Sequence, residues 1–393
     1  MRAPDLVWLF AARALRLLGF GAMPVVLGSY LKNRGLLEWQ IGVLLSLALF
    51  GDALVSLLVT RYADQFGRRR MLLGSSLLIG LAGLGFAAAQ DAPWLLFFAI
   101  VGTISPNGNE VGPFQALEQA CVSQVVEQKT RPRVYSWYQM IGVLAAALGA
   151  FLAGLWIERQ KGLGSSEVRA EQQIFVVYAL LCVLLLFAFS RLSGAIEVQR
   201  AAKQNTPAKA QKIWQLSGLF ALDAFGSTLV MQPFIALWLE QRFGVGAGIL
   251  GAVFAATNIV SALSLPIAGW LAGRWGLVNT MVFTHIPANV LLLLFPFAPS
   301  LELALALLIG RFCLSSMDIP ARTALVMAIV PPEQRSFAGG LTQQGKYLGN
   351  SLGPACHAAL VQSGVLVLPF VFGGVCKILY DLAIYAGFKR LEQ

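Results

Sequence analysis

The chain has 393 residues, of which 57% are hydrophobic and only 12% are charged, and its mean hydropathy is +0.70. Soluble domains carry roughly 25% charged residues, so this composition excludes a water-soluble globular protein and a disordered one. The net charge of +10 would suit a nucleic-acid-binding protein if basic residues gathered on a soluble surface, but they fall mainly between apolar runs. We therefore expect an all-α membrane protein whose partner is the lipid bilayer and not a nucleic acid.

Twelve apolar segments follow one another along the chain, and a membrane-spanning helix needs about 20 such residues. The predicted segments cover residues 6–31, 40–63, 71–90, 94–126, 134–157, 173–192, 213–239, 247–272, 278–298, 301–330, 336–362 and 365–388. The first is too long for a signal-peptide core and lacks a cleavage-like site, so we expect it to be retained. The fourth contains Pro106, Gly108 and Pro113, which membrane helices tolerate when neighbouring helices satisfy the freed backbone groups.

The distribution of Lys and Arg between the segments predicts the orientation. With the N-terminus inside, sixteen Lys and Arg residues lie on the cytoplasmic side and six lie outside. The positive-inside rule then predicts that both termini are cytoplasmic. We expect an integral protein of the plasma (inner) membrane.

A polar stretch at residues 193–212 contains Pro207 and shows no apolar periodicity. It falls near the middle of the chain and predicts a cytoplasmic linker. The predicted organisation is therefore an N-terminal six-helix half at residues 1–192, this linker, and a C-terminal six-helix half at residues 213–393.

The two predicted halves also repeat one another in sequence. Residues 60–67 align with residues 269–276, and the same offset of 209 carries Gly42 onto Gly251. Related halves of this kind place a binding site at their interface, near the bilayer midplane.

The loop after the second segment contains Asp64, Gly67, Arg68, Arg69 and Arg70. Together with the repeat and the segment count, this motif resembles the major facilitator superfamily over essentially the whole chain. The resemblance implies twelve transmembrane helices in two pseudo-symmetric six-helix halves, and a secondary transporter that works by alternating access. It also implies that Asp64, Gly67, Arg68 and Arg69 form a cytoplasmic gate that latches the two halves together.

Two positions depart from the family motif, since Thr60 replaces its first glycine and Gly273 replaces the aspartate in the second copy. The antiporter motif of the fifth segment is poorly matched, because Gly142, Gly149 and Gly154 occur there without a proline. Small residues at this spacing also permit close helix packing, which we prefer as their explanation.

Ionisable residues inside the predicted segments are candidates for function, because each costs a few kcal/mol or more to bury in a membrane. The resemblance implies that the first, fourth, seventh and tenth spans line a central cavity. The candidates for substrate binding or proton coupling are therefore Arg13, Arg16, Glu110, Asp223, Arg311, Asp318 and Arg322.

Among these candidates Glu110 is the first choice for a protonatable carboxylate and Asp223 is the second, because proton coupling requires a buried acid. The competing interpretation is a permanent ion pair with Arg13 or Arg16. Those arginines equally suit bidentate binding of an anionic substrate. Both interpretations stay open at this stage.

Two further patterns have a structural interpretation. Lys377 and Asp381 are four residues apart on the twelfth segment, which predicts that they neutralise each other on one helix face. His357 follows Cys356, and we favour a packed, hydrogen-bonded histidine over a site for a soft metal or metalloid. The remaining cysteines stand alone, so no metal site or disulfide framework is predicted.

The sequence therefore predicts a monomeric secondary active transporter of a small molecule, coupled to protons, without a cofactor. Export is preferred over uptake on family frequency alone. The alternatives are uptake of a nutrient or organic anion, metalloid export, and a receptor of the same fold that does not transport. An enzyme is not expected, because the sequence has no nucleophile elbow, phosphate loop or His-rich cluster.

Overall fold

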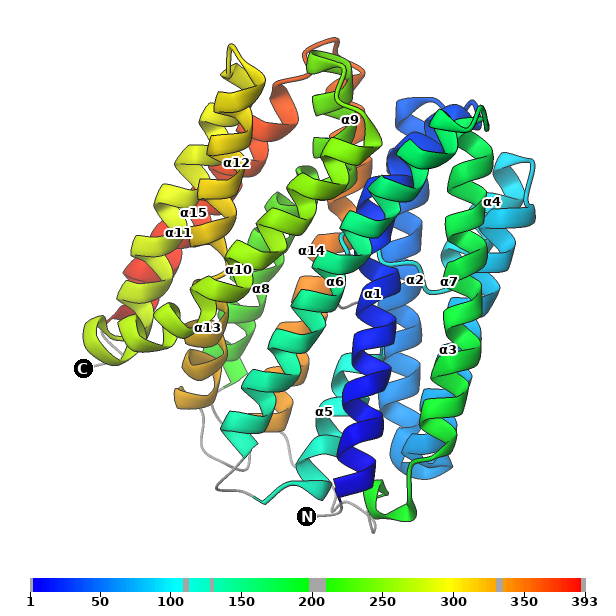
Figure 1. The fold of residues 1–393 in the computed structure, drawn as a ribbon. Coiled ribbons are helices and arrows are strands. Elements are labelled where there is room, and N and C mark those ends of the chain that lie inside the picture. The colour runs from blue at the N-terminus through cyan, green and yellow to red at the C-terminus, as the bar shows by residue number, and fades with distance from the viewer. Residues whose placement is uncertain (1–2, 109–112, 128–130, 198–209, 330–334, 390–393) are drawn as a thin grey trace. The chain divides into compact units, whose positions relative to one another are not determined.

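The computed structural model describes residues 3–108, 113–127, 131–197, 210–329 and 335–389, and every regular element in these ranges is helical (Figure 1). The helices are α1 (Ala3–Asn33), α2 (Glu38–Phe66), α3 (Arg68–Ala88), α4 (Ala92–Val101), α5 (Phe114–Val125), α6 (Arg131–Gly162), α7 (Glu167–Ser190), α8 (Ala210–Leu229), α9 (Gln232–Phe243), α10 (Ala247–Trp275), α11 (Leu277–Leu294), α12 (Leu301–Ser315), α13 (Asp318–Ala328), α14 (Arg335–Val361) and α15 (Leu368–Phe388). Two short 3₁₀ helices are η1 (Gly194–Ile196) and η2 (Phe295–Phe297).

Each of the twelve predicted segments coincides with one helix or with two consecutive helices. Within the described residues, ten helical stretches are long and apolar enough to cross a membrane. The prediction of an all-α membrane protein is confirmed.

Three predicted segments differ from expectation because each is split into two helices. The fourth is broken between α4 and α5, the seventh between α8 and α9, and the tenth between α12 and α13. A proline lies at or just after each break, and proline favours a break because it has no backbone N–H and clashes with the carbonyl four residues earlier. Pro320 lies in the first turn of α13, where a missing N–H is tolerated, and Pro233 lies in the first turn of α9.

The break before α9 also explains the position of a histidine. Pro233 cannot donate to the carbonyl of Leu229, and His357 Nδ1 lies 2.6 Å from that oxygen. The imidazole therefore satisfies a backbone group that the proline leaves free. The predicted hydrogen-bonded histidine is confirmed.

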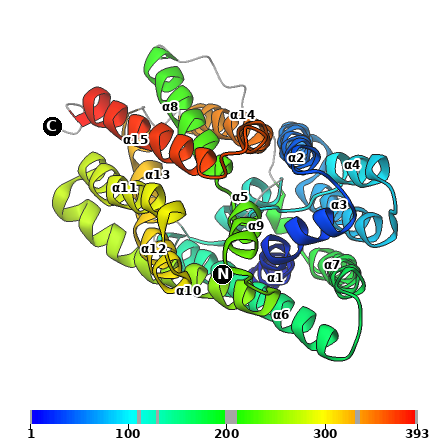
Figure 2. The same ribbon diagram turned by 90° about the horizontal axis from the view of Figure 1, so that it is seen from above.

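Internal contacts divide the chain into two compact units. Unit 1 comprises residues 1–37, 47–203 and 232–255, and in it α1 packs beside α6 and α7 (Figure 2). Unit 2 comprises residues 38–46, 204–231 and 256–393, and in it α8 packs beside α14 and α15. Because short stretches are exchanged between the units, the division at residues 192 and 213 stays a prediction.

The repeated glycines lie at close helix contacts inside the units. A Cβ on Gly42 would lie 2.5 Å from the carbonyl oxygen of Pro354, and one on Gly251 would lie 2.6 Å from that of Ala150. A Cβ on Gly149 would lie 1.9 Å from a backbone oxygen of α1. The expectation that small residues of the fifth segment permit close helix packing is confirmed at Gly149.

Candidate functional site: two buried clusters of charge

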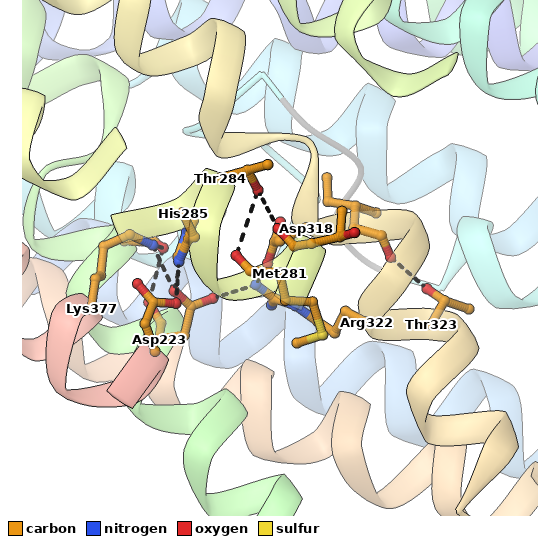
Figure 3. Close-up of polar contacts among 12 residues, drawn as sticks. Asp223, Met281, Thr284, His285, Asp318, Arg322, Thr323 and Lys377 are labelled. Carbon is orange, nitrogen blue, oxygen red and sulfur yellow. Dashed lines mark hydrogen bonds and ion pairs between the residues drawn. The ribbon is translucent and has the colours of Figure 1, made fainter. Parts of the chain in front are cut away.

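Asp223 lies at the centre of a buried network of ionisable side chains in unit 2 (Figure 3). Its Oδ1 is 2.6 Å from Nζ of Lys377, and its Oδ2 is 2.9 Å from Nη2 of Arg322. The three side chains come from α8, α15 and α13, and each residue is at most 8% exposed. Charge-assisted hydrogen bonds of this length are the strong ones, so the carboxylate is held between two cations.

Each of the two cations has a second partner. Arg322 forms an ion pair with Asp318, which lies one turn earlier on α13. Asp318 is in the first turn of that helix, where the helix dipole favours a negative charge. Lys377 donates a hydrogen bond to the hydroxyl of Ser227, at 2.7 Å. The structure thus brings together three of the predicted candidates, Asp223, Asp318 and Arg322.

A histidine that the sequence left isolated joins this network from α11. His285 Nδ1 lies 2.8 Å from Oδ1 of Asp381, and its Nε2 lies 3.9 Å from Oδ1 of Asp223. Asn289 donates a hydrogen bond of 2.9 Å to the other oxygen of Asp381. The predicted pairing of Lys377 with Asp381 is corrected, because Lys377 contacts Asp223 and Ser227 instead. The helix spacing allows the predicted pair, but tertiary packing offers each residue a closer partner. We call Asp223, Ser227, His285, Asn289, Asp318, Arg322, Lys377 and Asp381 the Asp223 network.

Two more cations, the buried Arg311 and the partly buried Lys346, interact electrostatically with Asp223. Arg311, a predicted candidate, is 7% exposed, and its Cζ lies 4.9 Å from the ring centroid of Phe312. Lys346 was not a candidate, and its Nζ lies 5.3 Å from the ring centroid of Phe220. Both cations face aromatic rings, a contact worth about 0.5–2 kcal/mol.

A second cluster, in unit 1, surrounds Arg16. This arginine on α1 forms an ion pair with Glu118 of α5, and both side chains are fully buried. Tyr138 of α6 donates a hydrogen bond to the same carboxylate oxygen. Arg13 donates to Gln139, and its Cζ lies 4.3 Å from the ring centroid of Tyr138. We call these five residues the Arg16 cluster.

The sequence left open whether Arg13 or Arg16 forms a permanent ion pair with a buried acid, and the Arg16 cluster addresses this question. Arg16 has a counter-ion, and that counter-ion is Glu118, which was not among the chosen candidates. A fully buried guanidinium requires a partner of opposite charge. This requirement was the signal in the sequence that could have pointed to an acidic partner for Arg16. Glu110, the first choice for a protonatable carboxylate, lies outside the described residues.

The gate motif contacts the segment that follows α7. Gly67 has φ of 94° and precedes α3, a conformation that favours glycine. The backbone N–H groups of Arg68 and Arg69 donate to Glu197 at 2.7 and 3.1 Å, so this carboxylate caps α3. The Arg69 side chain donates to the carbonyl of Ser190. Asp64 lies in the last turn of α2, and its side chain is outside the described residues.

These gate contacts lie inside unit 1, so the latch between the two halves stays a prediction. Glu197 was not predicted from the sequence, because it lies in the polar linker after the sixth apolar segment and has no motif of its own. Among the described residues, no group of three or more His, Cys, Asp or Glu is arranged to hold a metal ion.

Comparison with known proteins gives a consistent family match. A family model for the Major Facilitator Superfamily matches residues 9–221 and 216–390. The chain is 28% identical to the uncharacterized membrane protein YJR124C of Saccharomyces cerevisiae, over 99% of this chain and 95% of that one. It is 23% identical to the multidrug resistance protein MdtH of an Enterobacter species, over 97% and 94% of the two chains.

Among solved structures, the chain is similar to a bacterial homolog of the human lysosomal transporter Spinster in an inward-facing, unoccupied conformation. The TM-score is 0.74 at 16% identity, with 99% of this chain and 98% of that chain covered. At this identity the likeness shows the fold.

Proposed function

Because the chain belongs to the major facilitator superfamily and is therefore a membrane transporter and not an enzyme, we propose that it exports a small organic molecule in exchange for protons. It works as a monomer in the plasma (inner) membrane, with both termini cytoplasmic. One six-helix half moves against the other so that a central site opens to each side in turn, and the loop at Asp64, Gly67, Arg68 and Arg69 biases the cytoplasmic gate.

Export is supported by the names of relatives that match this chain over nearly its whole length. MdtH and two proteins of Bacillus subtilis carry names as multidrug resistance proteins, and each match covers about nine-tenths or more of both chains. The Asp223 network supports ion coupling, and the contact of Asp223 with both Lys377 and Arg322 is the observation that carries the proposal. Charges buried in a membrane are costly and mark ion or substrate pathways.

The network suits coupling because the partners of Asp223 have alternative partners. Arg322 has Asp318, Lys377 has Ser227, and His285 has Asp381. When Asp223 takes up a proton, each cation keeps one partner, so the loss of charge is shared among several contacts. Proton uptake at Asp223 therefore weakens the contacts between α8, α13 and α15, and it leaves Arg322 with a counter-ion and Lys377 with a hydrogen-bond partner.

The experiment begins with a thermal-shift screen of drugs and dyes against the purified protein, because a bound substrate raises apparent stability. Compounds that stabilise the protein are then followed in proteoliposomes with an imposed pH gradient. The variants are Glu110→Gln, Asp223→Asn and the two combined. We expect gradient-driven flux in the wild type, loss of that flux in the combined variant, and retained counterflow.

Two results would change the proposal. Gradient-driven flux that persists in the combined variant excludes Glu110 and Asp223 as the coupling groups, although transport itself stands. Accumulation of substrate on the side toward which protons flow shows symport and excludes exchange.

A further inference from the structure

Another buried acidic side chain lies in unit 1 and belongs to neither cluster. Asp52 is on α2 and is 3% exposed. Neither of its carboxylate oxygens accepts a hydrogen bond of standard geometry from a described residue. This sets Asp52 apart from Asp223, Glu118 and Asp381, which contact Lys377, Arg16 and His285 respectively.

In the described part of the chain, no Lys, Arg or His side chain forms an ion pair with Asp52. The adjacent residue Gly51 packs tightly on α4, since a Cβ there would lie 2.2 Å from the backbone oxygen of Ile100. α4 has no Lys, Arg or His, and α3 has none after Arg70. The titratable side chain that interacts with Asp52 is Tyr178 of α7. The cation that also acts on this tyrosine is Arg16, whose guanidinium contacts Glu118.

The polar groups near Asp52 come from the broken fourth span. Thr103 lies in the non-helical residues after α4, and its side chain interacts with Asp52. The Thr103 hydroxyl also has no hydrogen-bond partner of standard geometry in the described part of the chain. The backbone of Thr103 is fixed, because its N–H donates to Leu78 at 3.2 Å and its carbonyl accepts from the Tyr178 hydroxyl at 2.8 Å.

Non-helical backbone at membrane depth is found where it is buried in protein or lines a cavity, and broken helices in transporters often form ion sites. An ionised carboxylate sealed in such a place without a counter-ion costs several kcal/mol. A proton removes that cost, because it cancels the charge and supplies the carboxyl group with a donor for the Thr103 hydroxyl oxygen.

We propose that Asp52 is a proton-binding site of the N-terminal half, occupied by a proton while it is sealed beside Thr103. In the conformation that admits water to Asp52, the proton passes to water and leaves the carboxylate ionised. The site thus adds a coupling group to the proposed exchange of protons for substrate, and only the transport part of the inference rests on that proposed function.

The first test measures the proton itself and needs no substrate. Infrared spectra of the protein in lipid nanodiscs are recorded across pH for the wild type, Asp52→Asn and Glu171→Gln. Glu171→Gln is included because Glu171 is also fully buried in unit 1, where it accepts hydrogen bonds from Ser29 and Asn33, and burial favours the uncharged form of a carboxyl group. We expect a carboxylic-acid C=O component in the wild type that persists in Glu171→Gln and is missing in Asp52→Asn, and a separate Glu171 component that behaves in the opposite way.

Labelling the aspartate side-chain carboxyls with carbon-13 in the wild type provides an independent check if Asp52→Asn does not fold. The band is then expected to move, because Asp223, Asp318 and Asp381 contact cations or histidine. A C=O spectrum that is the same in the wild type and Asp52→Asn, or that has no component that moves on aspartate labelling, overturns the inference.

The second test uses a compound found in the thermal-shift screen. Asp52→Asn should lose gradient-driven flux and keep counterflow, whereas Glu171→Gln should keep both. If the wild type shows no gradient-driven flux while the infrared band is present, the proposed exchange fails and proton binding stands. If flux follows a sodium gradient and Asp52→Asn abolishes it, the assignment to a proton is wrong.

Discussion

The replacement Asp223→Asn tests the energetics of the Asp223 network directly. It keeps the side-chain shape but leaves Lys377, which is 3% exposed, without its counter-ion. Breaking a buried ion pair by removing one partner costs about 3–5 kcal/mol. The lower end of this range applies to Asp223→Asn, because Lys377 keeps its hydrogen bond to Ser227 and Arg322 keeps its ion pair with Asp318.

A loss of about 3 kcal/mol corresponds to a lowering of the unfolding midpoint by about 6–12 °C for a unit of this size. The double variant Asp223→Asn/Lys377→Met removes both charges, so it should be less destabilised than the single variant. The assay is thermal unfolding of the purified protein in detergent, followed by intrinsic fluorescence.

A matched control is Glu167→Gln, which breaks the exposed ion pair with Lys161 at 3.6 Å. Exposed pairs contribute about 0–1 kcal/mol, so this variant should unfold close to the wild-type temperature. The reasoning would be refuted by a single variant as stable as the wild type, or by a double variant at least as unstable as the single one.

Three other variants test packing, capping and gating. Gly149→Ala should lower the free energy of unfolding by about 1–3 kcal/mol, because its Cβ would overlap a backbone oxygen of α1. Gly74→Ala is the control and should leave the stability unchanged, because the space around Gly74 is open. Thermal unfolding of both variants tests this prediction. Glu197→Ala removes the carboxylate cap of α3 and should cost about 1 kcal/mol in the same assay, while Glu197→Asp should recover part of it. Asp64→Asn should slow transport in proteoliposomes without much change in substrate affinity, and wild-type turnover would contradict the gate.

The candidate site was only partly predictable from the sequence. Asp223, Asp318 and Arg322 were selected because they are charges within apolar segments, and because the family resemblance places those segments at the cavity. Their partners were not predictable in the same way. Lys377 was assigned to Asp381 on helix spacing, but packing of α15 against α8 brings it to Asp223.

Glu118 illustrates a second limit. It lies in the fourth apolar segment and was not among the chosen candidates. The structure places it against Arg16, about a hundred positions away along the chain. Contacts over such separations depend on which helices pack together, and a single sequence carries no record of that.

The sequence by itself determined the class of protein, the number of apolar segments and the family, because hydropathy and local motifs are properties of short stretches of chain. It did not predict that the fourth, seventh and tenth spans are each split into two helices. Only the tertiary structure decided which buried charges have partners. It is packing that gives Asp223 two cations and leaves Asp52 with none among the described residues, because the partner of a buried charge comes from a different helix.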